Sequence, residues 1–499
     1  MNEYGNQPGN FIDGRFRAPA KPDGALVIRC PGDLSEQVGI HPFAEADVEE
    51  AIEAARNAQR LWKSVPAATR EDALRRYQEA LRRHQSEIAE TIALEVGKAI
   101  WDATTEAKAL AAKVDLVLGP GASLTQSHKI PEINGELRYR PLGVVAVIGP
   151  FNFPAHLPNG QILPALHAGN AVVFKPSEKA PGTAYWLAKC FQEADLPNGL
   201  FNVVQGGPKI AERLTSHPEV DGILFTGSEN VGKSLIQANL DRPGRLLALE
   251  LGGKNASIVL DDADVNVAVR EIAFSAYVSS GQRCTATSRV YLSKEVEQAF
   301  LQALEQTVRS IQVGYPLDRQ VFMGPLVEEA ARLRLLEAQE RAVRAGFDPL
   351  VPGGPLTIEG RTGYYVRPSL HRAPSPDIRV AGYTHDELFG PDLAIYPVEH
   401  LDEAIEYANR TRYGLSAAVF TKSRALFEHA AAELEVGVLN WNRSSAGASG
   451  RLPFGGIKSS GNHHPVGIFA GKQCTYPQAL LCESETKHPA WPGIKLVDS

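Results

Sequence analysis

Val144-Val145-Ala146-Val147-Ile148-Gly149-Pro150 opens the segment that decides the fold. Five consecutive apolar residues end at a Gly-Pro pair, which is typical of a short buried strand followed by a turn. Further short strands are predicted at 171–174, 201–204 and 222–225, with helices between them that include 181–194 and 209–216. Because repeated strand–helix alternation produces a parallel sheet covered by helices on both faces, we predict an α/β fold.

The loops that follow these strands are expected to carry the chemistry. In open α/β sheets, ligands bind beyond the carboxyl ends of the strands. These loops read Gly149-Pro150-Phe151-Asn152-Phe153-Pro154, Lys175-Pro176-Ser177-Glu178 and Thr226-Gly227-Ser228. Each of them combines turn residues with polar groups that can reach a ligand.

The flanking segments suggest further elements on either side of this alternation. Apolar spacings of three and four predict helices over 44–118, and the first series is Val48, Ile52, Ala55 and Leu61. Asn134-Gly135 between extended flanks predicts a β-hairpin. A second strand–helix alternation begins beyond residue 250 and predicts a second α/β domain. The segment 468–482 is expected to be extended.

The composition bounds the function. The 499 residues are 43% hydrophobic and 22% charged, as in an ordinary globular protein. A net charge of −7 without a Lys/Arg block argues against nucleic-acid binding. Five cysteines without a C-x-x-C spacing predict neither a disulfide framework nor a metal site. The polar start of the chain lacks a signal-peptide layout, and no apolar run reaches the ~20 residues of a membrane span, so a cytoplasmic location is expected.

Two segments offer a nucleophile and a base. Gly281-Gln282-Arg283-Cys284 places a thiol on a loop, and Glu250-Leu251-Gly252-Gly253 places a carboxylate at the end of a strand-like run. A cysteine nucleophile reacts as its thiolate, and a thioester formed on it needs a base that activates water. Two ordinary interpretations compete: Cys284 as a small buried residue, and Glu250 as a member of a surface ion pair.

The chain resembles the NAD(P)-dependent aldehyde dehydrogenases over nearly its whole length. Seven segments, in the family's order, carry the resemblance: Pro150-Phe151-Asn152-Phe153-Pro154, Lys175-Pro176-Ser177-Glu178, Phe225-Thr226-Gly227-Ser228 with Val231-Gly232, Glu250-Leu251-Gly252-Gly253-Lys254, Gly281-Gln282-Arg283-Cys284, Glu387-Leu388-Phe389-Gly390-Pro391 and Pro453-Phe454-Gly455-Gly456. Within the family, the chain is most similar to the succinylglutamic semialdehyde dehydrogenases of arginine breakdown. The segments behind that similarity are His156-Leu157-Pro158-Asn159-Gly160, Asn440-Trp441-Asn442 and Ser460-Gly461-Asn462-His463, and the chain departs from the subfamily pattern at Leu251, Lys254 and Arg443.

The resemblance implies a set of catalytic residues. Cys284 would attack the aldehyde carbonyl, the Asn152 amide and the Cys284 backbone N–H would stabilise the oxyanion, and Glu250 would activate the water that hydrolyses the thioester. A turn-forming role is the ordinary alternative for Asn152.

The resemblance also implies sites for the cofactor and the substrate. NAD is the expected cofactor, with NADP as the alternative, because a carboxylate beside the adenine ribose repels a 2′-phosphate. The cofactor residues would be Lys175, Ser177, Glu178, Gly227, Ser228, Gly232, Glu387 and Phe389, although the Thr226-Gly227-Ser228 loop alone could simply cap a helix. The candidate substrate residues are Arg443, His156 and Lys113, since an acidic semialdehyde such as N-succinyl-L-glutamate 5-semialdehyde needs cations; a solvated loop charge is the alternative for Arg443.

The family implies an aldehyde dehydrogenase-like arrangement of domains and an oligomer. We expect a Rossmann-type NAD-binding domain, a second α/β catalytic domain, and a β-hairpin oligomerisation element that forms a homodimer or homotetramer. The expected boundaries are 1–122 and 142–249 for the NAD-binding domain, 250–440 for the catalytic domain, 123–141 and 466–485 for the oligomerisation strands, 441–465 for the substrate loop region, and 486–499 for a tail.

Three functional alternatives stay open from the sequence. The substrate could be another semialdehyde or an aliphatic or aromatic aldehyde. A CoA-acylating relative would pass the thioester to a thiol, although the presence of Glu250 argues against that reaction. A catalytically idle structural member would keep the fold without the activity.

Overall fold

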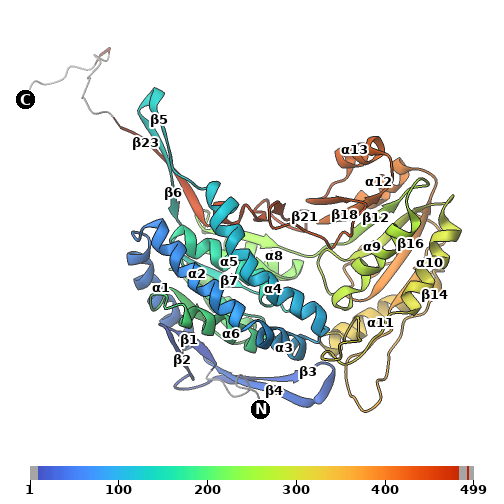
Figure 1. The fold of residues 1–499 in the computed structure, drawn as a ribbon, viewed down its shortest axis with the longest axis horizontal. Helices are drawn as coiled ribbons and strands as arrows, with labels where there is room; N and C mark the ends of the chain where they lie inside the picture. Colours follow the sequence, from blue (N-terminus) through green and yellow to red (C-terminus); the bar gives the residue numbers. More distant parts are fainter. Residues whose placement is uncertain (1–8, 483–491, 494–499) are drawn as a thin grey trace, which may run out of the picture.

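A computed structural model describes residues 9–482 and 492–493 of the chain (Figure 1). Apart from 492–493, the predicted tail at 486–499 lies outside these residues, and so do positions 483–485 of the predicted oligomerisation strands. Two separate seven-stranded sheets and a projecting three-stranded sheet organise the described part. The α/β fold predicted from the strand–helix alternation is confirmed.

The first sheet contains all four strands predicted around residue 144. Its order is β11-β10-β7-β8-β9-β1-β2, and the five strands β11 to β9 in that order pair in parallel. Their bounds are β7 (Val144–Ile148), β8 (Ala171–Lys175), β9 (Phe201–Val203), β10 (Gly222–Thr226) and β11 (Leu246–Glu250). Two edge strands, β1 (Asn10–Ile12) and β2 (Arg15–Arg17), were not predicted, because three residues are too few to show an alternating pattern.

Helices cover this sheet on both faces. They are α1 (Ala46–Trp62), α2 (Ala67–Arg83), α3 (Gln85–Val96), α4 (Ile100–Leu116), α5 (His156–Ala168), α6 (Pro181–Glu193), α7 (Pro208–Ser216) and α8 (Glu229–Ala238). In α1, Val48, Ile52 and Ala55 are buried as predicted, but Leu61 is 76% exposed. Trp62, seven residues after Ala55, takes the buried place because seven residues make nearly two full turns.

The second sheet has the order β14-β15-β16-β13-β12-β18-β19. Its strands are β12 (Asn255–Val259), β13 (Thr287–Ser293), β14 (Asp348–Val351), β15 (Ser369–Arg372), β16 (Asp392–Val398), β18 (Ser416–Phe420) and β19 (Val438–Trp441). Its helices are α9 (Val265–Tyr277), α10 (Glu297–Arg309), α11 (Glu329–Arg344), α12 (Leu401–Asn409) and α13 (Arg424–Glu433). Only β14 runs antiparallel to its neighbour among the pairs of this sheet.

A third sheet, β23-β6-β5, projects away from the two larger ones (Figure 1). It contains β5 (His128–Ile130), β6 (Gly135–Pro141) and β23 (Thr475–Leu481). The hairpin predicted at Asn134-Gly135 is confirmed, and Asn134 has the left-handed φ of 47° that the turn requires. The prediction of an extended 468–482 is wrong at its start, because α14 (Ala470–Gln473) is helical and packs against α5.

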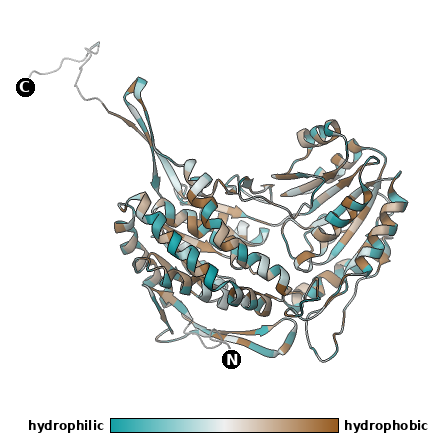
Figure 2. Cartoon of the chain, in the orientation of Figure 1, coloured by the Kyte–Doolittle hydropathy of each residue, from teal (hydrophilic) through white to brown (hydrophobic). Residues whose placement is uncertain are grey.

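Shorter elements complete the described chain. They are β3 (Gly24–Cys30), β4 (Asp33–Phe43), β17 (Tyr413–Gly414), β20 (Pro453–Phe454), β21 (Ile457–Lys458), β22 (Val466–Gly467), the π-helical turn η1 (Val117–Gly121), and the 3₁₀ turns η2 (Pro131–Ile133) and η3 (Val278–Gly281). In Figure 2 the outward-facing helix α2 is largely hydrophilic, whereas the strands behind the helices are richer in hydrophobic residues. None of the helices in the described residues combines the length and the apolar character that crossing a bilayer would need.

Candidate active site

Cys284 follows a strained turn between α9 and β13. Ser279, Ser280 and Gly281 have successive φ values of 53°, 56° and 69°, and each left-handed non-glycine residue costs roughly 1–2 kcal/mol. Gly281 has no alternative, since a Cβ there would lie 2.2 Å from the carbonyl oxygen of Gly390. The turn therefore aims Cys284 in a direction that a relaxed loop would not adopt.

An ion pair from α4 holds this turn. Arg283 Nη2 donates to Asp102 Oδ1 over 2.7 Å, and the Ser279 hydroxyl donates to Asp102 Oδ2 over 2.5 Å. Arg283 Nε also donates to the Ser279 hydroxyl oxygen over 2.8 Å. Because Asp102 belongs to a helix on the first sheet, it ties the Cys284 loop to the other half of the molecule. No motif in the sequence indicated this role of Asp102.

Asn152 reaches the same loop from the first sheet. It lies beyond the carboxyl end of β7, is 6% exposed, and donates from Nδ2 to the Gln282 carbonyl oxygen over 3.0 Å. The ring of the following residue, Phe153, has its centroid 3.8 Å from Lys98 Nζ and 4.8 Å from Arg283 Cζ. This hydrogen bond therefore holds the Asn152 amide against Gln282, which lies two residues before Cys284 in the loop.

Glu250 ends β11 and is 6% exposed. The backbone N–H of Val466 donates to its carboxyl group, and Glu250 Oε2 has no hydrogen-bond partner among the described residues. Burial raises the pKa of Glu250 well above its ordinary value. The ordinary interpretation as a surface ion pair is wrong, because the carboxyl group is buried and has no cationic partner in the described chain.

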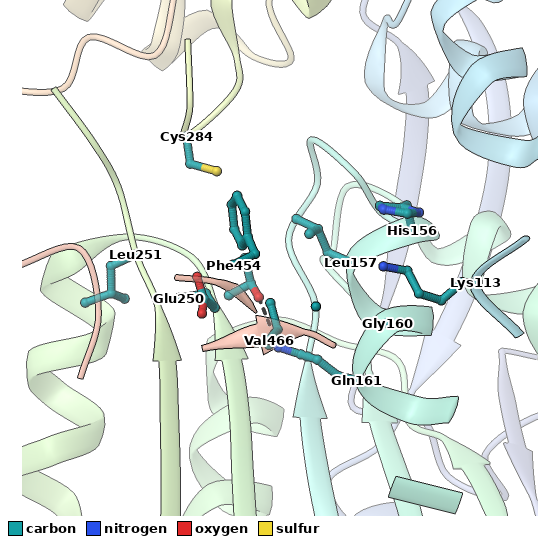
Figure 3. Close-up of a pocket in the computed structure, with 12 residues that line it drawn as sticks. Lys113, His156, Leu157, Gly160, Gln161, Glu250, Leu251, Cys284, Phe454 and Val466 are labelled. Carbon is teal, nitrogen blue, oxygen red and sulfur yellow. Dashed lines mark hydrogen bonds between the residues drawn. The ribbon is translucent and has the colours of Figure 1, made fainter. Parts of the chain in front are cut away.

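One cavity is lined by both the thiol and the carboxyl group (Figure 3). It is lined by Lys113, His156, Leu157, Gly160, Gln161, Thr226, Glu250, Leu251, Cys284, Phe454, Val466 and Gly467. Figure 3 shows Lys113 and His156 on the side of the cavity that lies across from Cys284 and Glu250. The segment Pro453-Phe454-Gly455-Gly456 had no assigned role in the sequence, and Phe454 now lines the cavity.

The Cys284 thiol is protonated in the free protein at neutral pH. Burial raises its pKa to about 12, the charges of Glu387 and Glu250 add to the increase, and Arg283 opposes it. A reaction at this thiol therefore needs a nearby base or a change of environment on ligand binding.

The predicted cofactor residues lie at adjacent strand ends. In the order β10-β7-β8, the loops after Thr226, Ile148 and Lys175 lie side by side. Lys175 is buried, and its Nζ lies 3.6 Å from Glu178 Oε2. Ser177, the residue between them in the same loop, is also buried.

The N-terminus of α8 fits a phosphate. The Ser228 hydroxyl caps this helix by accepting from the Val231 N–H. The other N–H groups of the first turn, those of Glu229 and Asn230, can donate to an anion. A Cβ at Gly227 would lie 2.4 Å from the Phe225 ring, and a Cβ at Gly232 would lie 2.8 Å from Leu251, so a side chain at either position would have to displace its neighbour. The turn therefore admits the close approach of a dinucleotide.

Glu387 and Phe389 approach this region from the second sheet. Glu387 Oε1 accepts from the Gly253 N–H over 3.0 Å, and burial raises the pKa of this carboxyl group to about 7. The Phe389 ring packs edge-on against Phe151, with the centroids 5.8 Å apart. These side chains and the β10, β7 and β8 loops can hold the nicotinamide and adenine halves of a dinucleotide.

The three predicted substrate residues separate in the structure. His156 begins α5 and Lys113 lies in the last turn of α4, and both line the cavity with Cys284. Arg443 is exposed on the loop after β19 and does not belong to the cavity lining.

Comparison with known proteins relates the chain to one family. A sequence model described as the aldehyde dehydrogenase family matches residues 20–480. Lactaldehyde dehydrogenase from Escherichia coli is 32% identical and superposes with a TM-score of 0.88, with 95% of this chain and 99% of that one covered.

Two further solved structures contain cofactors. An aldehyde dehydrogenase C variant from Pseudomonas syringae, solved with NAD+ and octanal, is 29% identical, has a TM-score of 0.89, and covers 96% of this chain and 97% of its own. An NADP-dependent glyceraldehyde-3-phosphate dehydrogenase from Bacillus halodurans, solved with NADP, is 30% identical and has a TM-score of 0.86. The match covers 95% of this chain and 98% of that chain. The three relatives differ in the aldehydes that they name, so this likeness does not identify a substrate.

Proposed function

The chain belongs to the aldehyde dehydrogenase family, and from this premise we propose that it oxidises an aldehyde to a carboxylate through Cys284. The observation that carries the proposal is the shared cavity of the Cys284 thiol and the buried Glu250 carboxyl group. The thiolate adds to the aldehyde carbonyl and gives a thiohemiacetal. Bound NAD or NADP supplies the hydride acceptor, and loss of the hydride leaves a thioester on Cys284.

The oxyanion of the thiohemiacetal is stabilised by the Asn152 amide and the Cys284 backbone N–H. The position of Asn152 Nδ2, 3.0 Å from the Gln282 carbonyl oxygen, supports this role because the amide already lies against the nucleophile loop. Donors fixed in this way cost little reorganisation when the charge develops.

Glu250 then activates the water that hydrolyses the thioester. Its position in the same cavity as the Cys284 thiol supports this role, and burial raises the pKa of its carboxyl group, which makes the carboxylate a stronger base. The same carboxyl group argues against release to a thiol such as CoA, because a water-activating base beside the thioester favours hydrolysis.

The cofactor is held by the loops at the ends of β8, β7 and β10. Lys175, Ser177 and Glu178 bind the adenine ribose, and Gly227, Ser228 and Gly232 bring the N-terminus of α8 to the pyrophosphate. Glu387 and Phe389 hold the nicotinamide half. The partly exposed Glu178 carboxylate favours NAD, since it would repel a 2′-phosphate.

Replacement of the nucleophile tests this proposal. Cys284→Ala should abolish NADH formation from any aldehyde and leave NAD binding, measured by calorimetry, near that of the wild type. Cys482, which is exposed, offers the matched control, and Cys482→Ala should keep full turnover. Turnover by Cys284→Ala at the wild-type rate would exclude Cys284 as the nucleophile.

We further propose an acidic semialdehyde, such as N-succinyl-L-glutamate 5-semialdehyde, as the substrate. The Lys113 ammonium group in the cavity lining, with the hydrogen-bonding ring of His156 beside it, supports this substrate class. A panel of NADH-formation assays should rank this semialdehyde above neutral aliphatic, aromatic and betaine-type aldehydes. A higher kcat/KM for a neutral aldehyde would assign the enzyme to another substrate. Arg443 stays a predicted contact to be tested beside Lys113.

The assembly and the location are also proposals. The projecting β5-β6-β23 sheet exposes Ile133 and Leu481, which supports a homodimer or homotetramer formed through it. Sedimentation at several concentrations tests this, and a monomer at all of them would exclude it. All five cysteines are free thiols, which supports the cytoplasm as the compartment.

A further inference from the structure

One face of α4 supplies charged groups to the active site. Asp102, Glu106 and Lys113 are separated by four and seven residues, so they lie on one side of the helix. This side meets the Cys284 loop, the start of α5 and the cavity. The helix therefore sets the charge of the cavity wall that lies across from Cys284.

Both carboxylates on this face are already committed to cations. Glu106 Oε2 accepts from Lys98 Nζ over 2.6 Å, and Glu106 Oε1 accepts from the backbone N–H groups of Ala155 and His156 at 3.0 Å. Asp102 pairs with Arg283 over 2.7 Å. Lys98 and Arg283 are thus neutralised by acids on the same helix face.

Lys113 has no such partner. No carboxylate of residues 9–482 forms an ion pair with it, and burial lowers the pKa of its ammonium group without any opposing carboxylate. Glu250, the acid that lines the same cavity, accepts from the Val466 N–H and forms no ion pair with Lys113. Lys113 is half-buried, lines the cavity and forms no ion pair with a carboxylate of residues 9–482, which indicates that a ligand can supply the missing charge.

The surroundings of Lys113 leave space for that ligand. Two glycines border the ammonium group: a Cβ at Gly160 would lie 3.7 Å from Lys113 Nζ, and a Cβ at Gly450 would lie 3.5 Å from it. His156 Nδ1 is buried without a hydrogen-bond partner in the described chain. Burial and the cations of Lys113, Lys98 and Arg283 lower the pKa of His156 to about 3, so the ring is neutral and can donate one hydrogen bond.

We propose that Lys113, with the His156 ring as a second donor, binds a carboxylate at the end of the substrate that is remote from the aldehyde. The inference rests on the proposed function and assigns the recognition of the acidic group to α4 rather than to the exposed Arg443. It makes the enzyme selective for aldehydes that carry a carboxylate on the same chain.

Matched aldehydes test the assignment. Succinic semialdehyde and butanal have the same chain length and differ in the terminal carboxylate, and so do glutaric semialdehyde and pentanal. The readout is the ratio of kcat/KM for the acid to that for the neutral aldehyde. Lys113→Met should lower this ratio about 10- to 100-fold, as expected for the loss of a charge-assisted hydrogen bond, and Lys113→Arg should keep part of it.

Two further variants complete the test. Lys108→Met removes an exposed lysine from the same helix and, as the control, should leave the ratio unchanged. Arg443→Ala probes the alternative contact, and the assignment to α4 predicts that it lowers the ratio much less than Lys113→Met does. If Lys113→Met does not fold, as judged by its thermal transition, Lys113→Gln takes its place.

The possible results separate this inference from the proposed function. If no aldehyde yields NADH with the wild type, the proposed function fails. If aldehydes are oxidised but the wild type shows no preference for the acid, or Lys113→Met lowers kcat/KM equally for both members of a pair, the Lys113 site is refuted. A ratio that collapses in Arg443→Ala and persists in Lys113→Met would refute it as well and assign the carboxylate to Arg443.

Discussion

Removal of the Asp102 carboxylate should disable Cys284 from a distance. The side chains of Asp102 and Arg283 are 2% and 12% exposed, so Asp102→Ala leaves the Arg283 guanidinium charged and almost buried. Breaking a buried pair in this way costs about 3–5 kcal/mol, and the lost acceptor for the Ser279 hydroxyl adds about 1 kcal/mol. We therefore expect the free energy of unfolding to fall by about 4–6 kcal/mol.

The effect on catalysis has a different physical origin. The left-handed residues Ser279 and Ser280 relax once Asp102 no longer holds them, and Cys284 then moves out of line with the aldehyde. A misplacement of about 1 Å costs about 10²-fold in rate, so kcat should fall by that factor with little change in KM.

A double variant separates the two effects. Asp102→Ala with Arg283→Met removes both charges and should recover most of the lost stability in denaturant titration, while kcat stays low. As a control, Asp115→Ala removes another carboxylate of α4, which forms an exposed ion pair with Arg75 of α2. This variant should change the unfolding free energy by less than about 1 kcal/mol. Wild-type kcat in the double variant would show that Asp102 only compensates a charge and does not position Cys284.

Two further predictions concern the chemistry at Cys284. Asn152→Ala should lower kcat about 10²–10³-fold through the loss of one oxyanion donor, and a loss confined to KM would contradict that role. Because burial and the Glu387 and Glu250 carboxyl groups raise the pKa of Cys284 to about 12, its alkylation by iodoacetamide in the free enzyme should rise about tenfold per pH unit from pH 6 to 9. Mass spectrometry of the Cys284 peptide measures this rate, and a plateau below pH 8 would show a thiolate already formed in the free enzyme.

The buried parts of the fold were predictable from the sequence. Apolar runs such as Val144–Ile148 are continuous because both faces of the strand are covered, and the alternation with helices then determines a parallel sheet. The short edge strands and α14 lack such a signal, because three or four residues show neither an alternating nor a helical period. Leu61 and Trp62 show the same limit, since adjacent apolar residues do not reveal which one faces the core.

Candidate site residues could be proposed where they lie on recognisable loops. Cys284, Glu250 and Asn152 belong to short motifs that resemble those of the aldehyde dehydrogenases, and Cys284 and Glu250 line one cavity in the structure. The role of Asp102 was not predictable, because its partner lies far along the chain: Asp102 and Arg283 are 181 positions apart. The backbone N–H groups that Glu106 accepts from, those of Ala155 and His156, are likewise about 50 positions away. That Lys113 forms no ion pair in residues 9–482, whereas Lys98 and Arg283 do, can be recognised only from the three-dimensional structure.

The most direct test of the central claim is a single turnover by Glu250→Gln. Without the base, oxidation should proceed once and hydrolysis should stall, so that NADH appears in a burst of about one per active site. Intact-protein mass spectrometry should then show an acyl adduct, located on Cys284 by peptide mapping. Steady NADH formation at the wild-type rate, with no adduct on Cys284, would contradict the account.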